Sequence, residues 1–287
     1  MSGTVLAFDL GGTRLKAGLV AGDAVERLVA PDLRRTDDAG AVVAQMVEVG
    51  RELIAGREIA AVGAAVKGIV AAHSGRVVEV NEPLRSLSGM ELGRELSAAF
   101  GVPAAIENDA RLFAYGELLH GAGRGVANLV GMTLGTGVGV GVALGGTLLS
   151  GERGVLGILG GHLSVDWQGP LCDCGNRGCL ELYVAGPAAS SLLEAARRGE
   201  ASARQPLERF TAILATGVVN LVHAYDPDVV VLGGGLAHAS DLFLDALREQ
   251  VSRQAWTIPR GRVRIEVSQL GEGAALLGAA ELARRSA

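Results

Sequence analysis

The sequence contains only three cysteines, and no block of lysine and arginine in it is longer than two residues. With a net charge of −5, this argues against nucleic acid or an anionic membrane as the main partner. No apolar run reaches the length that spans a membrane, and the start of the chain lacks a signal-peptide pattern, so a cytoplasmic protein is expected. In the reducing cytoplasm, three cysteines indicate a metal site or a reactive thiol more readily than disulfides.

Composition places the chain among globular proteins. Hydrophobic residues make up 49% and charged residues 20%, which excludes a disordered chain. The length of 287 residues is enough for a sizeable core in one or two domains.

The cysteines are close together in the sequence, at Cys172, Cys174 and Cys179, and His162 precedes them. Three thiolates and one imidazole supply the four tetrahedral ligands of a closed zinc site. Such a site leaves no position for water, which predicts a structural zinc rather than a catalytic one. The alternative is that three buried or incidental cysteines lie together without a metal.

Strand-like and helix-like segments alternate along the chain, which predicts an α/β fold. Predicted strands cover 5–10, 14–20, 59–70, 102–109 and 228–237, two more lie within 128–151, and predicted helices cover 41–56, 89–101, 110–121, 186–199, 209–227, 241–255 and 274–285. A strand, a glycine-rich turn and a strand occur in both halves, so we expect two similar lobes with a cleft between them. The expected lobes are 1–118, onto which a terminal helix 274–287 packs back, and 119–273 with the zinc-binding loop.

Two glycine-rich turns have the composition of a phosphate-binding nest. They are formed by Gly11, Gly12 and Thr13 and by Gly135, Thr136 and Gly137. Asp9, beside the first turn, is a candidate to hold Mg²⁺ through water. The Walker and dinucleotide-binding spacings are both absent. An ordinary hairpin explains either turn alone, whereas a pair at corresponding places in two half-chains favours phosphate binding.

Asn108 and Asp109 end a predicted strand and open a helix. A helix N-cap is the simple interpretation of this pair. The alternative is catalytic, because phosphoryl transfer to an alcohol needs a group that accepts the alcohol proton and orients the oxygen. Asn108 then serves as donor and acceptor for a neighbouring hydroxyl.

Five motifs follow one another in an order that resembles the ROK family: FDLGGT (8–13), ENDA (107–110), LGTGVGVG (134–141), GHLSV with CDCGNRGCLE (161–181), and VVLGGG (230–235). This family includes bacterial glucokinases, N-acetylsugar kinases and sugar-responsive repressors. The resemblance covers nearly the whole chain. It implies an actin-like (ribonuclease-H-like) ATPase fold with two lobes and a central cleft. It also implies ATP- and Mg²⁺-dependent phosphorylation of a sugar hydroxyl, usually at C6, by a homodimer.

The resemblance also implies roles for single residues. Asp109 matches the catalytic base. The implied sugar ligands are Asn108, Asp109, His162, Glu181 and Gly68, and the implied ATP and magnesium ligands are Asp9, Gly11, Gly12, Thr13, Lys16, Gly135, Thr136, Gly137, Gly234 and Gly235. The structural zinc, held by His162, Cys172, Cys174 and Cys179, then fixes the loop that presents His162 and Glu181 to the sugar.

The sequence departs from the family pattern where the sugar is recognised. The glutamate of the sugar loop is replaced by Leu159 or, if one glycine is inserted, by Ile158. Lys67 stands where a proline is usual, as a surface lysine or as an ammonium that faces the substrate, and Ala71 lies near the position of a missing aspartate. We therefore expect intact phosphate chemistry and altered sugar specificity.

Eight residues precede Asp9, too few for the helix-turn-helix of the repressor branch, so no nucleic-acid partner is expected. Two alternatives to a sugar kinase remain. One is a catalytically weak sugar-sensing or scaffold protein of the same fold. The other is an acetate-kinase-like or polyphosphate-dependent transferase.

Overall fold

A computed structural model describes residues 3–34, 36–71 and 74–286 of the chain. The chain divides into two compact units, Met1–His120 with Ser150–Leu156 and Glu272–Ala287, and Gly121–Leu149 with Gly157–Gly271. The expected lobes differ from these units mainly at Ser150–Leu156, which they assign to the second lobe and the structure to the first unit. Local sequence does not reveal this, because residues distant in the sequence hold the segment.

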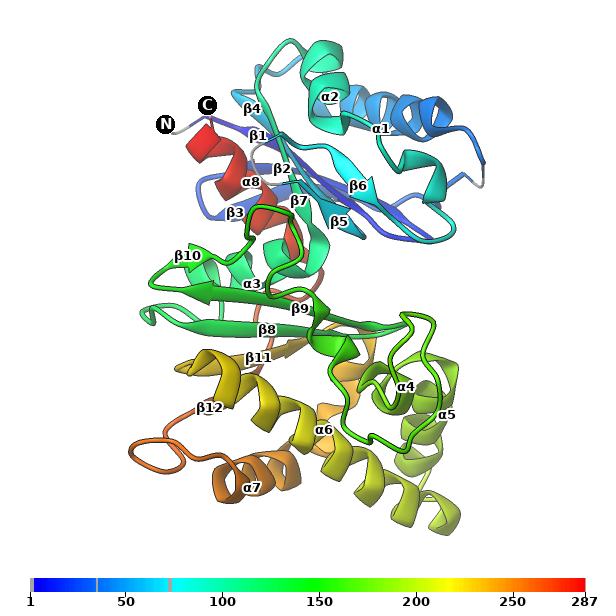
Figure 1. The fold of residues 1–287 in the computed structure, drawn as a ribbon. Helices are drawn as coiled ribbons and strands as arrows, with labels where there is room; N and C mark the ends of the chain where they lie inside the picture. Colours follow the sequence, from blue (N-terminus) through cyan, green and yellow to red (C-terminus); the bar gives the residue numbers. More distant parts are fainter. Residues whose placement is uncertain (1–2, 35, 72–73, 287) are drawn as a thin grey trace. The chain divides into compact units, whose positions relative to one another are not determined.

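Each unit is built on a five-stranded sheet, and the two sheets share one topology (Figure 1). The first has the order β3 (Ala24–Val29), β2 (Leu15–Ala21), β1 (Val5–Leu10), β4 (Ala61–Val66), β7 (Ala104–Asn108), and the second has the order β10 (Thr147–Leu148), β9 (Val138–Leu144), β8 (Leu129–Leu134), β11 (Val229–Gly233), β12 (Arg264–Val267). In both, the first three strands pair antiparallel and the next two join parallel. The predicted repeat of strand, turn and strand is confirmed.

Helices cover the sheets. In the first unit, α1 (Ala39–Ile54) and α2 (Leu92–Phe100) lie on one face of the sheet, and α3 (Asp109–His120) and α8 (Ala274–Ser286) lie on the other (Figure 1). The second unit has α4 (Glu181–Val184), α5 (Gly186–Arg197), α6 (Arg204–Tyr225) and α7 (Leu244–Gln254), with 3₁₀ turns η2 (Leu159–His162) and η4 (Gly235–Leu242). Within the described ranges, no helix is both long and apolar enough to cross a membrane.

Four strands were not predicted, namely β3, β10, β12 and the short β6 (Val77–Glu79). Two predicted strands are shorter than expected, and the one expected over 228–237 ends at Gly233. β3 is largely exposed, and Ile265 is the one buried residue of β12, so neither has the apolar pattern of a core strand. The strand expected over 59–70 ends at Val66. It is followed by Gly68 at φ +100° and then by β5 (Ile69–Val70), which pairs with β6 (Val77–Glu79).

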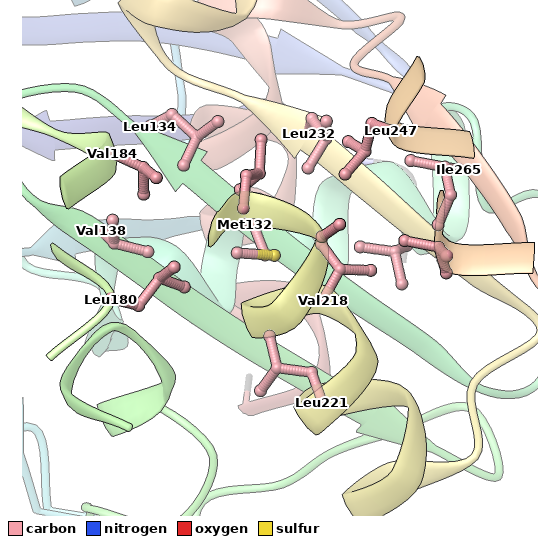
Figure 2. Packing of buried hydrophobic residues seen from close by; sticks show 14 of the residues in the cluster. Met132, Leu134, Val138, Leu180, Val184, Val218, Leu221, Leu232, Leu247 and Ile265 are labelled. Atoms are coloured by element: carbon pink, nitrogen blue, oxygen red, sulfur yellow. The ribbon is translucent and has the colours of Figure 1, made fainter. Parts of the chain in front are cut away.

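The core of the second unit forms between α6 and its sheet. Figure 2 shows Met132 and Leu134 of β8, Leu232 of β11 and Val218 of α6 in one cluster, and all four side chains are buried. Each such side chain contributes about 1.5–3 kcal/mol by leaving water. This core fixes β8, whose end leads into the glycine-rich turn at Gly135.

In the first unit, the backbone of α8 contacts the backbones of β4 and α3. A Cβ atom on Gly63 of β4 would lie 2.2 Å from the carbonyl oxygen of Ala279. A Cβ on Gly116 of α3 would lie 2.0 Å from the carbonyl oxygen of Ala274, and one on Gly278 of α8 would lie 2.0 Å from that of Leu112. Only glycine allows this approach. The contact fixes α3, which begins at Asp109.

Gly116→Ala tests this packing. Alanine favours a helix over glycine by about 1 kcal/mol, but here its methyl group overlaps the backbone of α8, and such overpacking costs about 1–3 kcal/mol. We expect a lower urea midpoint of unfolding. Gly40→Ala, at an exposed position in the first turn of α1, is the matched control: its added methyl group meets only the Asp38 carboxylate, at 3.2 Å, and no backbone of another helix, so the midpoint should change less. Equal midpoints for both variants would contradict the close contact.

Candidate functional site

The carboxyl ends of the parallel strands β1, β4 and β7 meet at one edge of the first sheet, where α/β proteins bind ligands. Pairing places Asp9 opposite Ala65, and Ala65 opposite Glu107. Because side chains alternate in direction along a strand, Asp9 and Glu107 lie on the same face of the sheet. β7 then leads directly to Asp109. The fold therefore gathers carboxylates at this edge.

Asp9 shares an ion-pair network with Lys16 and Glu272. Lys16 Nζ lies 3.5 Å from Asp9 Oδ2 and 3.5 Å from Glu272 Oε1. Burial raises the pKa of Asp9 to about 6, Lys16 opposes this shift, and the charge of Asp109 adds to it. Glu272 is not among the predicted site residues, because it comes from the far end of the chain and belongs to no motif. The proposed magnesium carboxylate thus lies in a partly desolvated place.

Asp109 is held in similar surroundings. Burial raises its pKa, while the hydrogen bond from the Ala110 amide (2.8 Å to Oδ1) and the charge of Lys67 lower it. The chain has only two lysines among 26 basic residues, and both act on this pair of carboxylates. Lys67 is half-buried rather than a freely exposed surface lysine. Its ammonium is therefore a candidate contact for an anionic or hydroxyl-rich substrate.

Asn108, rather than Asp109, caps helix α3 through a side-chain bond. Asn108 Oδ1 accepts a hydrogen bond from the Arg111 amide (3.1 Å), and Asn108 Nδ2 donates to the carbonyl oxygen of Gly68 (2.8 Å). Gly68 is required at its position, because a Cβ there would lie 2.4 Å from the carbonyl oxygen of Glu79. Asp109 is the first helical residue. The capping interpretation thus applies to its neighbour.

The two glycine-rich turns join equivalent strands of the two sheets. Gly11, Gly12 and Thr13 follow β1, and the Gly11 amide donates to the carbonyl oxygen of Arg14 (3.1 Å). Gly135, Thr136 and Gly137 follow β8, and the Gly135 amide donates to the carbonyl oxygen of Gly137 (3.0 Å). Thr13 and Thr136 are exposed. Both turns are tight, and because the amides of Gly11 and Gly135 are paired within them, a phosphate nest would use the other amides of each turn.

In the second unit, the predicted nucleotide residues lie together. Gly234, at φ +82°, lies close to the end of β8. A Cβ there would lie 2.4 Å from the carbonyl oxygen of Leu134, the residue before Gly135. Gly235 begins η4, and a Cβ on it would meet open space. The turn after β11 and the turn after β8 therefore lie side by side at the carboxyl edge of this sheet.

Glu181 contacts the second turn directly. Its Oε2 accepts a hydrogen bond from the Val138 amide (2.8 Å). A Cβ on Gly137 would lie 2.4 Å from the same oxygen. Glu181, expected from the resemblance to bind sugar, thus also joins the cysteine-bearing segment to the turn at Gly135–Gly137.

The four predicted zinc ligands form one cluster. His162, Cys172, Cys174 and Cys179 have ligand atoms within 4.8 Å of one another. Cys172 Sγ lies 3.7 Å from His162 Nδ1, and Cys174 Sγ lies 3.6 Å from Cys179 Sγ. Tetrahedral coordination with Zn–S bonds near 2.3 Å places ligand atoms about 3.8 Å apart. The cluster therefore fits a zinc ion.

The backbone around the cluster is built for this approach. Gly175 has φ +89°, and a Cβ on Gly178 would lie 1.8 Å from the carbonyl oxygen of Asp166. Burial raises the pKa of the Cys179 thiol to about 12, and the hydrogen bond from the Asn176 amide lowers the pKa of Cys174. Metal binding to these thiols releases protons, so it weakens as pH falls.

The two candidates for the replaced glutamate differ in exposure. Leu159, the first residue of η2, is 47% exposed, whereas Ile158 is half-buried. Leu159 thus presents an apolar side chain three residues before His162. Glu107 and Arg111, which form a buried ion pair beside Asn108, are not among the predicted site residues. The signal in the sequence was a charged residue, Arg111, within the apolar stretch DARLFAYG.

The comparisons identify the family. The model of the ROK family matches residues 5–286. This chain belongs to the ROK family. It is 32% identical to a glucokinase of Thermotoga maritima, over 97% of this chain and 96% of the relative, and 31% identical to an N-acetyl-D-glucosamine kinase of Vibrio cholerae, over 96% and 98%. The expected class of enzyme, a sugar kinase, is confirmed at this level.

A solved structure supports the fold. The ROK glucokinase of Streptomyces griseus, solved with glucose and AMPPNP, superposes with a TM-score of 0.84 at 27% identity, over 99% of this chain and 100% of that one. The expected actin-like fold is confirmed. A putative xylose repressor of a Caldicellulosiruptor species is 32% identical over 77% of this chain but only 61% of its own length.

We predict one tightly bound zinc per chain. Cys174→Ser should lose the metal and lower the thermal midpoint, because one thiolate is gone and the glycine-rich loop is freed. Asp173→Asn, an exposed neighbour outside the cluster, should keep both. Elemental analysis of protein purified without chelator measures the metal. Wild-type protein without zinc would contradict the assignment.

Proposed function

We propose that the protein transfers the γ-phosphoryl group of ATP to a sugar hydroxyl, at C6 of a hexose or hexose derivative, with Asp109 as general base. The observation that carries the proposal is the placement of Asp109. It is the first residue of α3, and Asn108 supplies the side-chain cap in its place. Burial raises its pKa, which makes it a stronger base than an ordinary aspartate.

The reaction needs one proton acceptor and one oriented oxygen. Asp109 accepts the proton of the sugar hydroxyl as the new bond forms between that oxygen and the γ-phosphorus. The bond from the γ-phosphorus to the β–γ bridging oxygen breaks, and ADP leaves with the electron pair. The Ala110 amide holds Asp109 Oδ1, so the carboxylate is oriented before the substrate arrives.

Contacts to the nucleotide and to magnesium are proposed for each unit by itself. In the first unit, Gly11, Gly12, Thr13 and Lys16 are proposed for phosphate and Asp9 for magnesium. In the second, the proposed nucleotide contacts are Gly135, Thr136, Gly137, Gly234 and Gly235. Magnesium neutralises charge on the phosphates when it is bound. The carboxylate of Asp9 would hold the magnesium ion, and the ammonium of Lys16 beside it would face the negative phosphates.

The sugar is assigned to Asn108, Gly68, His162 and Glu181. Asn108 is already fixed through Gly68, so its amide presents a defined edge to a hydroxyl. The zinc is structural in this proposal and holds the segment that carries His162. A homodimer, a cytoplasmic location and the absence of a nucleic-acid partner stay predictions.

Asp109→Asn tests the base. The change keeps shape but removes the proton acceptor, so kcat should fall by roughly 10²–10⁴, while sugar and ATP affinities change little. Asp38→Asn, at the N-cap of α1, is the control, because asparagine caps a helix as well as aspartate does. Calorimetric binding and a coupled ADP assay supply the measurements. Near wild-type turnover would remove Asp109 from catalysis.

Leu159→Glu tests sugar specificity. An apolar side chain leaves a sugar hydroxyl without a partner, so we expect plain glucose to be a poor substrate and a sugar altered or substituted at C1 or C2 to be preferred. Leu159→Glu should raise kcat/KM for glucose, or Ile158→Glu should do so instead. A wild-type kcat/KM for glucose above about 10⁴ M⁻¹s⁻¹ would show that another group replaces the glutamate.

A further inference from the structure

Arg111 is a fully buried arginine two residues after Asp109. Its side chain is 0% exposed, and its Nη1 lies 2.8 Å from Glu107 Oε1. Its Nη2 donates to the carbonyl oxygens of Ser150 (3.0 Å), Gly154 (3.0 Å) and Leu156 (2.8 Å). A buried charge is costly unless it is paired and fully hydrogen-bonded. The segment Ser150–Leu156 supplies much of that hydrogen bonding.

The same network holds the end of β7. Glu107 Oε1 also accepts a hydrogen bond from the Asn108 amide (2.6 Å), and the Arg111 amide donates to Asn108 Oδ1. The Arg111 side chain therefore acts on Asn108 through Glu107, whereas the bond from its backbone amide is independent of the side chain. Asn108 is a proposed sugar ligand, and the proposed base follows it.

The segment Ser150–Leu156 is fitted closely to the first unit. A Cβ on Gly154, at φ +71°, would lie 2.1 Å from the carbonyl oxygen of Val70. Within the segment, the Gly154 amide donates to Gly151 and the Leu156 amide donates to Ser150. After Leu156 the chain continues through Gly157 into η2, which carries Leu159 and His162.

We propose that Arg111 is a positioning residue for sugar phosphorylation. Its side chain fixes the Asn108–Asp109 pair and anchors the segment Ser150–Leu156. The chain continues from this anchored segment into the turn that carries His162. This inference rests on the proposed function. A guanidinium suits the task, because its planar fork of donors serves a carboxylate and several carbonyls at once, whereas a lysine ammonium is a single point of charge.

The test compares Arg111→Lys with wild type and with Arg262→Lys. Arg262 is a matched control in the second unit, since it also donates to a backbone carbonyl, that of Pro227 (3.0 Å), and pairs with Asp228. The first readout is hydrogen exchange in the protein without substrate. We expect the amides of Gly154 and Leu156 to exchange at least tenfold faster in Arg111→Lys and unchanged in Arg262→Lys.

The second readout is the kinetics of each substrate. In Arg111→Lys, kcat/KM for the sugar should fall about 10–100-fold, as a small misplacement of reacting groups does, while KM for ATP stays within about twofold. Faster exchange with unchanged sugar kinetics would show that Arg111 has only a structural role, which would overturn the proposal. Equal losses for sugar and ATP, or unchanged exchange, would also overturn the proposal.

A further variant covers the case in which Arg111→Lys fails to fold. Gly154→Ala leaves Arg111 in place but displaces the segment from Val70, and it should give the same pattern of exchange and sugar-specific loss. Wild-type protein that phosphorylates no sugar would refute the proposed function instead. The exchange comparison would then still decide whether Arg111 anchors the segment.

Discussion

Two carboxylates, Asp9 and Asp109, are held partly out of water at the same edge of the first sheet, and the proposed chemistry depends on this. Each is desolvated and each has a raised pKa, which makes the arrangement costly to the folded state. The chain offsets this cost with its two lysines and with backbone donors such as the Ala110 amide. Such tension between stability and function is typical of catalytic sites, where charged groups are held in environments matched to their chemistry.

Helix packing makes that edge rigid. Gly63, Gly116 and Gly278 let α8 and α3 approach at backbone distance, so the first residue of α3 has little freedom to shift. In the second unit, the cysteine cluster and Glu181 serve a comparable purpose. Glu181 follows Cys179 and Leu180 in the sequence and accepts a hydrogen bond from the Val138 amide, beside the turn at Gly135–Gly137, so a zinc ion at the cluster would stabilise that turn as well as its own loop. The hydrogen bond from Val138 to Glu181 therefore links the cysteine-bearing segment to the glycine-rich turn.

Local patterns predicted much of this arrangement. The motifs identified both glycine-rich turns, the cluster of His162 with the three cysteines, and the Asn108–Asp109 pair, because each depends on residues near in sequence. Long-range partners were missed. Glu272 reaches Lys16 from the far end of the chain, and the Ser150–Leu156 segment joins the first unit through Arg111, which no local pattern reveals. The sequence also could not decide which of Asn108 and Asp109 caps α3, because either residue type caps a helix.

Phosphorus NMR on wild-type protein tests the central claim most directly. The protein is incubated with ATP, Mg²⁺ and each of a set of hexoses, amino sugars and N-acetyl sugars, with polyphosphate as an alternative donor. The account predicts ADP and a new phosphate monoester whose phosphorus couples to the two protons at C6 of one or more sugars. ATP that stays intact with every sugar, or a monoester formed only from polyphosphate, would contradict it.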